Sequence, residues 1–228
     1  MTILRAAAAG SVAVALSLTA VPGARAAAGP GGLAAPAVRG LDVSAYQHQG
    51  PPIDWPRISR LGFNFVGIKV SEGTYYRNPY YLSDARSAAG AGLAVLPYVF
   101  ADPRRAGGRA TASFAASVTG TRRGQAQLPF VVDLENDPYK KADNCYGRRV
   151  PVMLEWITGF IAEARQLTGQ WPVIYTTDAW WRQCTGATTR FGRSPLWLAA
   201  FGAADPSVPA PWHQWAFWQY ADNGAVPG

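Results

Sequence analysis

Residues 129–136 read PFVVDLEN, and this stretch is the most informative part of the chain for its fold. Its apolar residues run together instead of alternating with polar ones, which is typical of a strand buried on both faces. Further apolar runs of this kind lie at residues 40–44, 63–70, 93–100, 172–176, 196–201 and 215–220. Parallel sheets covered by helices contain such strands, so the sequence predicts an α/β protein.

Amphipathic segments separate the earlier runs, at residues 54–61, 79–89, 109–118 and 150–167. In the last segment the apolar residues recur every three to four positions, which indicates a helix with one buried face, and Gly169 is a typical end for it. Alternating strands and helices predict parallel strands with crossover helices. No convincing helix separates the final two runs. We therefore predict a modified (β/α) TIM-like barrel with a β-only final portion, with a doubly wound open sheet as the alternative.

The first 38 residues differ in composition from the rest. A basic start, an apolar run over residues 6–21 and the small-x-small triplet at residues 24–26 are typical of a secretory signal peptide covering residues 1–26. An uncleaved anchor is the alternative. Residues 27–38 are rich in Gly, Pro and Ala and predict a flexible linker, which leaves residues 39–228 as the folded domain. No later segment is apolar for long enough to span a bilayer, so we expect a secreted, extracellular protein with no membrane partner in its mature form.

Charge and cysteine usage fit this location. The chain carries a formal net charge of +7, and a basic secreted protein suits an anionic polymer such as a bacterial wall. Cys145 and Cys184 are the only cysteines, and an isolated pair in an oxidising compartment is expected to form a disulfide. With two histidines and no CxxC pattern, the chain predicts neither a metal site nor a cofactor.

Acidic residues follow several of the predicted strands, at the ends where functional groups collect in a barrel. Asp133 and Glu135 end the fourth strand, and Asp42 ends the first. Residues i and i+2 of a strand face the same side, so we expect the pair to point together into the barrel mouth. Two adjacent carboxylates repel, which raises the pKa of one and keeps it protonated near neutral pH, as glycoside cleavage requires. A solvated turn or helix cap over residues 133–137 is the alternative.

Aromatic residues are abundant, with nine Trp and ten Tyr. Sugars stack their C–H faces on such rings, so an aromatic-walled groove suits a polysaccharide, although core packing explains some of the rings. The residues predicted to bind substrate are Tyr46, Tyr98, Tyr175, Trp181, Trp197 and Gln219. Lys69 and Glu72 also lie at a strand end and are interpreted as a salt-bridged pair at the rim, without assigned chemistry.

Six motifs occur in order from residue 39 onward: GLDVSAYQ (40–47), FVGIKVSEG (65–73), PFVVDLEN (129–136), PVIYTT (172–177), LWLAAF (196–201) and WAFWQYADNGAVPG (215–228). Together they resemble the family 25 glycoside hydrolases, the N-acetylmuramidases or Chalaropsis-type lysozymes. The cysteine pair, in NCYG and QCTG, is similar to the actinomycete and fungal branch of that family. The resemblance implies a modified β/α barrel that hydrolyses the β-1,4 bond between N-acetylmuramic acid and N-acetylglucosamine in peptidoglycan.

The resemblance also implies residue roles. It places the proton donor on Glu135, the support of an oxocarbenium-like or oxazoline-like species on Asp133, and the first-strand acid of the family on Asp42. The implied partner is the glycan strand of peptidoglycan, bound by a monomer that has no nucleic-acid partner. A chitinase-like barrel and a non-catalytic wall-binding barrel are the alternatives; the first is disfavoured because Val131 and Pro129 stand where it carries Asp and Gly.

Two features depart from the family pattern. The third strand reads Tyr98-Val99-Phe100, whereas most members carry a histidine in the middle position. Members also continue beyond the final motif into a short segment that bears another acid, and Asp222 lies several residues too early to replace it. We therefore expect a domain whose final segment is missing, with reduced activity relative to a complete member.

Overall fold

The structure, a computed structural model, describes residues 2–6, 38–124, 128–140, 143–203 and 205–224. The strands are β1 (Thr2–Ala6), β2 (Val38–Val43), β3 (Phe65–Glu72), β4 (Tyr76–Arg77), β5 (Ala94–Phe100), β6 (Val131–Asp133), β7 (Val173–Thr176), β8 (Leu196–Ala199) and β9 (Phe217–Ala221). The helices are the 3-10 helix η1 (Ala45–His48) and the α-helices α1 (Trp55–Arg60), α2 (Tyr81–Gly90), α3 (Gly108–Thr119), α4 (Val150–Thr168) and α5 (Asp178–Thr185). The predicted α/β class is confirmed.

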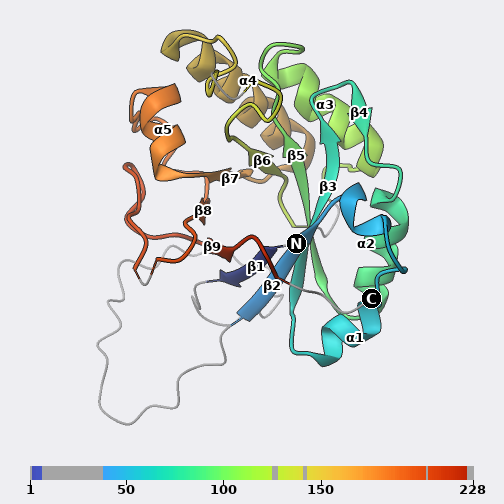
Figure 1. The fold of residues 1–228 in the computed structure, drawn as a ribbon. Helices are drawn as coiled ribbons and strands as arrows, with labels where there is room; N and C mark the ends of the chain where they lie inside the picture. Colours follow the sequence, from blue (N-terminus) through green and yellow to red (C-terminus); the bar gives the residue numbers. More distant parts are fainter. Residues whose placement is uncertain (1, 7–37, 125–127, 141–142, 204, 225–228) are drawn as a thin grey trace.

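The strands form one curled sheet in the order β2-β1-β9-β8-β7-β6-β5-β3-β4, and β2 also pairs with β3. Strands β2, β3 and β5 to β9 run parallel, whereas β1 and β4 pair antiparallel with their neighbours. Helices α1 to α5 lie in an arc along the outside of the sheet (Figure 1). This arrangement confirms the modified barrel over the open sheet.

Two apolar layers hold the sheet, because alternate residues of each strand face opposite sides. The inner layer fills the barrel with one residue from each of five strands, namely Phe65, Leu96, Val131, Val173 and Trp197. The outer layer, which includes Val132 and Leu134, packs between the sheet and the helices. A slip of one residue in β6 would move its apolar set to the wrong face, so the alternation fixes the side on which Asp133 lies.

The longest predicted helix is confirmed as α4, and it packs closely against α3. Met153, Ile157, Phe160 and Ile161 form its buried face, and Gly169 ends it with φ +79°, a left-handed conformation that favours glycine. Gly108, at the start of α3, lies directly against the α4 backbone. The two helices therefore approach at a point where a side chain would not fit.

Helix α5 was not predicted, because its eight residues are too few to show a clear helical period. The local signals of this helix are its ends. The Thr177 hydroxyl accepts a hydrogen bond from the Trp180 amide at 3.1 Å, and Gly186 ends the helix with φ +64°. No helix lies between β8 and β9, as predicted, and the connection over residues 200–216 is irregular where it is described.

Strand β1 was also not predicted, because residues 2–6 belong to the segment interpreted as a signal peptide. It lies between β2 and β9 and pairs antiparallel with both. Cleavage of residues 1–26 stays a prediction, and most of that segment and the expected linker fall within residues 7–37, outside the described residues. Among the described residues no helix is both long and apolar enough to cross a membrane.

The contact at Gly108 yields a prediction for stability. A Cβ there would lie 1.9 Å from the carbonyl oxygen of Trp156 and 2.6 Å from the amide nitrogen of Phe160. Both are backbone atoms, so the helices must separate, and Gly108→Ala is expected to lower the free energy of unfolding by about 2–3 kcal/mol. The matched control is Gly90→Ala at the end of α2, where no heavy atom lies within 4 Å. Denaturant unfolding of the two variants measures the difference, and equal stabilities would contradict the close helix contact.

Candidate active site

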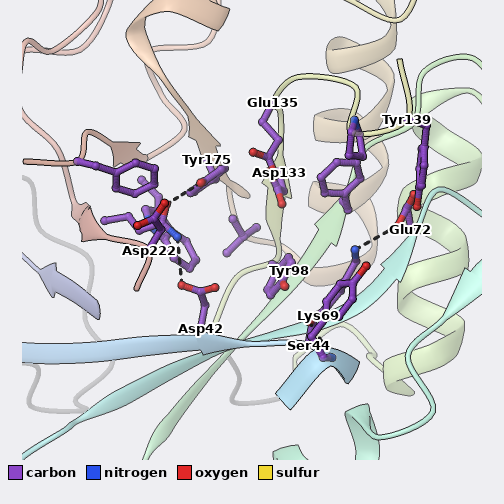
Figure 2. Close-up of a pocket in the computed structure, with 17 residues that line it drawn as sticks. Asp42, Ser44, Lys69, Glu72, Tyr98, Asp133, Glu135, Tyr139, Tyr175 and Asp222 are labelled. Carbon is purple, nitrogen blue, oxygen red and sulfur yellow. Dashed lines mark hydrogen bonds and ion pairs between the residues drawn. The ribbon is translucent and has the colours of Figure 1, made fainter. Parts of the chain in front are cut away.

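A cavity of about 540 Å³ opens at the carboxyl ends of the parallel strands. All three predicted catalytic residues, Asp42, Asp133 and Glu135, line it, and so do all the predicted substrate-binding residues except Trp181. Figure 2 shows Asp42, Tyr98, Asp133, Glu135 and Tyr175 around this cavity, although they lie far apart in the sequence. The structure therefore brings these residues together at one cavity, and their functional roles stay a prediction.

The backbone of β6 explains why two carboxylates share this cavity. Asp133 ends the strand between Phe100 of β5 and Tyr175 of β7. The sheet hydrogen bonds continue past it, because the Leu134 amide donates to the carbonyl oxygen of Tyr175 at 2.9 Å. Leu134 is fully buried in the outer layer, so Glu135 returns to the cavity side. The pair faces one cavity, as the i, i+2 spacing predicts.

Burial dominates the electrostatics of the pair. It raises the pKa of Asp133 well above its ordinary value, and the charge of Glu135 raises it further. Burial likewise raises the pKa of Glu135 to about 7, with Lys69 opposing this shift and Asp42 adding to it. The two carboxyls titrate as a unit, and at neutral pH the pair retains a proton. Oδ1 of Asp133 is buried and has no hydrogen-bond partner among the described protein atoms.

A chain of hydrogen bonds orients the opposite wall of the cavity. The Tyr175 hydroxyl donates to Oε1 of Gln219 at 2.6 Å, and Nε2 of Gln219 donates to Oδ2 of Asp42 at 3.1 Å (Figure 2). The two bonds fix which end of the Gln219 amide faces Asp42. Asp42 therefore remains a hydrogen-bond acceptor on a side chain that cannot rotate freely. Beneath this wall the Trp197 ring is 2% exposed and packs edge-on against Tyr175.

A second polar cluster, the Lys69–Glu72 network, lies at the other end of the cavity. Nζ of Lys69 is 3.2 Å from Oε2 of Glu72, and Tyr75 and Tyr139 also donate to this carboxylate. Burial works to raise the pKa of Glu72, but these hydrogen bonds and the Lys69 charge outweigh it, and the pKa is lowered. Glu72 is therefore an ionised carboxylate, in contrast to Asp133 and Glu135, which together retain one proton.

The sequence did not assign Glu72 to the site, because a bulge decides where it points. The pairing of β3 with β5 shifts between Lys69 and Ser71, so that Glu72 pairs with Phe100. Without the extra residue, the alternation that turns Lys69 inward would have placed Ser71 in the cavity and Glu72 outside. Phe201 and Asp222 also line the cavity and were not predicted as site residues.

The prediction that Trp181 lines the groove is wrong. Its side chain is fully buried in α5, and its indole N–H donates to the carbonyl oxygens of Ala210 and Thr188. Its ring packs on Trp212 with the centroids 4.7 Å apart. Trp181 lies on the buried face of α5 and points into the core. It was predicted to line the groove because it lies shortly after a predicted strand. By contrast Tyr46 is 74% exposed at the lip of the cavity.

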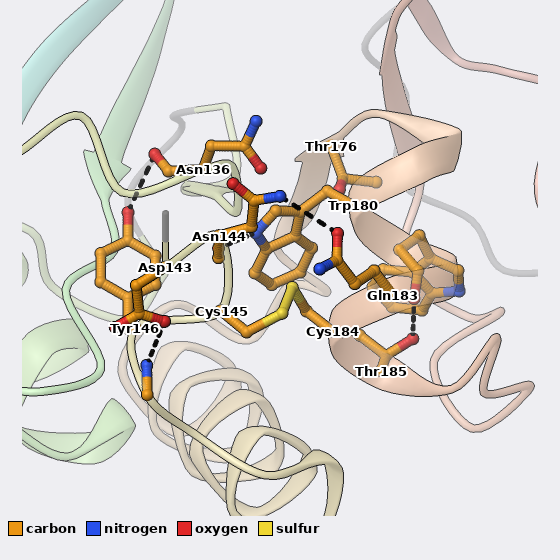
Figure 3. Close-up of a disulfide and its surroundings, with 12 residues drawn as sticks. Asn136, Asp143, Asn144, Cys145, Tyr146, Thr176, Trp180, Gln183, Cys184 and Thr185 are labelled. Carbon is orange, nitrogen blue, oxygen red and sulfur yellow. Dashed lines mark hydrogen bonds between the residues drawn. A yellow bond between two sulfur atoms is a disulfide. The ribbon is translucent and has the colours of Figure 1, made fainter. Parts of the chain in front are cut away.

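The loop that follows Glu135 is fastened at several points. Cys145 and Cys184 form the predicted disulfide, with a Cα–Cα distance of 5.3 Å, and this bond ties the loop to α5 (Figure 3). The Trp180 indole N–H donates to the Asn144 carbonyl oxygen at 3.0 Å beside it. Nearer the carboxylates, buried Asp137 pairs with Arg104 at 2.5 Å. These contacts hold the backbone on which Glu135 is placed.

A curled parallel sheet with a buried carboxylate pair in an open cavity defines a glycoside hydrolase. The chain belongs to the glycosyl hydrolases family 25, whose model matches residues 41–228. It is 37% identical over 193 residues to Lysozyme M1 of Streptomyces globisporus, covering 84% of this chain and 64% of that protein.

Two further relatives agree in sequence and in fold. The N,O-diacetylmuramidase of Chalaropsis sp is 34% identical over 197 residues, covering 84% of this chain and 91% of that protein. The crystal structure of a bacterial lysozyme from Streptomyces coelicolor superposes with a TM-score of 0.77 at 36% identity, covering 83% of this chain and 86% of the other. The predicted family is therefore confirmed.

The electrostatics of the pair predict a titration that can be observed directly. Glu135 is expected to titrate near pH 7, and Lys69→Met is expected to raise its pKa because the variant removes a cation that favours the carboxylate. NMR of ¹³C-labelled carboxyl groups measures both values. The matched control is Lys140→Met, since Lys140 is exposed and does not line the cavity. A Glu135 pKa that stays unchanged in Lys69→Met would contradict the assigned interaction.

The disulfide yields a prediction for stability. Its cysteines are 39 residues apart, and the double variant Cys145→Ser/Cys184→Ser is expected to lose about 3–4 kcal/mol of unfolding free energy, because the unfolded chain regains the freedom of that closed loop. Thermal unfolding of the oxidised protein against the variant measures the loss. An unchanged melting temperature would show that the bond does not stabilise the fold.

Proposed function

We propose that this protein is a secreted lysozyme that hydrolyses the β-1,4 bond between N-acetylmuramic acid and N-acetylglucosamine in bacterial peptidoglycan. The observation that carries the proposal is the buried pair Asp133 and Glu135 in the cavity of a family 25 barrel. Two relatives that each share about a third or more of their aligned residues with this chain are named as a lysozyme and an N,O-diacetylmuramidase, which supports the same substrate. The disulfide supports secretion, because such bonds persist in oxidising compartments.

In the proposed reaction Glu135 is the proton donor. Its pKa of about 7 leaves a large fraction protonated at mildly acidic to neutral pH. Its proton passes to the glycosidic oxygen as the bond from that oxygen to the anomeric carbon breaks, and the leaving sugar departs with a free hydroxyl. Glu135 lies one residue beyond the buried Leu134 and is less buried than Asp133, so it is the carboxyl that a glycosidic oxygen can reach.

In the form of the pair in which the shared proton is on Glu135, Asp133 is the ionised carboxylate, and it stabilises the positive charge that develops at the anomeric carbon. Its unpartnered Oδ1 is the acceptor for this species, whether it is oxocarbenium-like or the oxazoline-like form that the acetamido group of the substrate would make. Water then attacks the anomeric carbon and returns a proton to Glu135, which restores the starting state. Asp42, held by Gln219, and the Tyr175 hydroxyl bind polar edges of the sugar on the opposite wall.

Replacing the proton donor tests the function. Glu135→Gln is expected to lower kcat by about 10³-fold, because the amide keeps the shape of the side chain but cannot protonate the leaving oxygen. Turbidity loss of a Gram-positive wall suspension and release of new reducing ends measure the activity. In the wild type, kcat/KM should fall as pH rises through about 7, since the protonated form is the active one.

The matched control for this experiment is Glu155→Gln, because Glu155 is exposed on α4 and remote from the cavity. It should keep wild-type activity. Release of reducing ends from chitin without lysis of walls would point instead to a chitinase-like enzyme. Wall binding with no product from either the wild type or Glu135→Gln would overturn the proposal that the protein is an enzyme.

A further inference from the structure

A basic cluster lies at the end of the barrel opposite the carboxylate cavity. It is formed by Trp171, which lies two residues before the start of β7, and by three exposed arginines from three different segments. Arg123 lies in the loop after α3, Arg165 in the last turn of α4, and Arg193 in the loop before β8. Because β7 and β8 begin here and end at the cavity, the cluster and the cavity occupy opposite poles of the sheet.

The indole ring positions two of the three guanidinium groups. Cζ of Arg165 lies 3.8 Å and Cζ of Arg193 4.8 Å from the centroid of the Trp171 ring. Arg123 lies beside the end of α4, since a Cβ built on Gly169, two residues before Trp171 in the chain, would be 4.0 Å from the Nε of Arg123. Contacts of this kind hold long side chains in place and reduce the entropy that a ligand would otherwise have to remove.

The distribution of charge leaves this cluster without acidic partners. Among the described residues no carboxylate forms an ion pair with Arg123, Arg165 or Arg193, although other surface arginines such as Arg109 and Arg182 do form such pairs. The cavity at the other pole is lined by Asp42, Glu72, Asp133, Glu135 and Asp222. Acidic side chains therefore gather at the cavity, and the three arginines present a cationic surface at the opposite end of the barrel.

The chemistry of the cluster favours a chain of phosphodiesters. A guanidinium presents two parallel N–H groups to a phosphate, and adjacent guanidinium groups suit phosphates that repeat along one flexible polymer. The alternative polymer with this charge is single-stranded nucleic acid, which is bound largely by stacking its bases on free aromatic faces. Trp171 is half-buried, and the two guanidinium groups lie against its ring, so it offers little surface for a base.

We propose that the Trp171 cluster binds a linear, polyol-type phosphodiester polymer of the bacterial wall, and so holds the enzyme on the wall while the opposite pole acts on the glycan. This goes beyond the proposed function, because it assigns a second surface with a different ligand. Binding at this pole leaves the cavity accessible, so one molecule can engage both polymers at once. Its effective concentration at the glycan then rises without any new contact in the active site.

The test is co-sedimentation of the full chain with purified Gram-positive walls, before and after acid removal of their phosphodiester polymer. All proteins carry Glu135→Gln, so that the walls stay intact if the protein is a lysozyme. Arg165→Gln/Arg193→Gln is expected to weaken binding to untreated walls about tenfold at 0.1 M salt, because two phosphate contacts are lost. Binding to treated walls should be equally weak for both proteins. On untreated walls, Arg165→Lys/Arg193→Lys should bind with an affinity between those of the intact cluster and the Gln double variant. Lysine keeps the positive charge but lacks the two parallel N–H donors of a guanidinium.

The matched control is Arg57→Gln/Arg60→Gln, which removes the same charge from exposed positions on α1. Equal losses in the two double variants would overturn the proposal in favour of net charge alone. The proposal would also be overturned if the protein with the intact cluster bound treated walls as tightly as untreated walls. Tighter binding to single-stranded DNA than to purified polymer with the same number of phosphates would overturn it as well. If the arginines merely cover Trp171, Arg165→Gln/Arg193→Gln would lower the melting temperature and leave the preference for untreated walls unchanged.

A separate hydrolysis assay distinguishes this proposal from the proposed function. Hydrolysis of a soluble peptidoglycan oligosaccharide by proteins with Glu135 restored reports on the cavity alone. Loss of that activity in the wild type would contradict the lysozyme proposal, whatever the binding result. Polymer-dependent binding without hydrolysis would leave the Trp171 cluster supported and the enzyme proposal overturned.

Discussion

The desolvation of two carboxyl groups inside a barrel is the constraint on which the rest of the site depends. Asp133 and Glu135 lie in a cavity whose floor is apolar, and burial disfavours two negative charges there. The pair therefore keeps a proton near neutral pH. A proton held in this way can be given to a substrate, and the same burial that is costly for folding makes the chemistry possible.

The surroundings limit that cost without removing it. Lys69 places one cation beside the acids, but Glu72 engages it, so the pKa of the pair remains raised. The loop that carries Glu135 is held by its disulfide and by the buried ion pair of Asp137 and Arg104. A looser loop would let Glu135 turn into solvent and ionise. The stability of this loop and the acidity of Glu135 are thus linked through one backbone segment.

Much of the fold could be predicted because it follows from local patterns. The apolar runs became strands and the period of residues 150–167 became α4, since burial on one face or on two leaves a direct mark on the sequence. The eight residues of α5 show no clear helical period, and residues 2–6, which form β1, were interpreted as part of a signal peptide, so neither element was predicted. The error at Trp181 has the same origin, because an aromatic residue after a strand has no local feature that distinguishes a groove wall from a core residue.

The sequence by itself determined the family, the strands that form long apolar runs, and the side of the sheet on which Asp133 and Glu135 lie, because strand alternation is a local geometric rule. Only the tertiary structure decided how those acids behave. The pKa of a carboxyl depends on its burial and on charges brought from distant segments, here Asp42 and Lys69. The tertiary structure also decided that a bulge turns Glu72 into the cavity, and that Arg165 and Arg193 meet at Trp171. Contacts between residues that are far apart in the sequence depend on how the whole chain folds, and the local spacing of residues does not encode them.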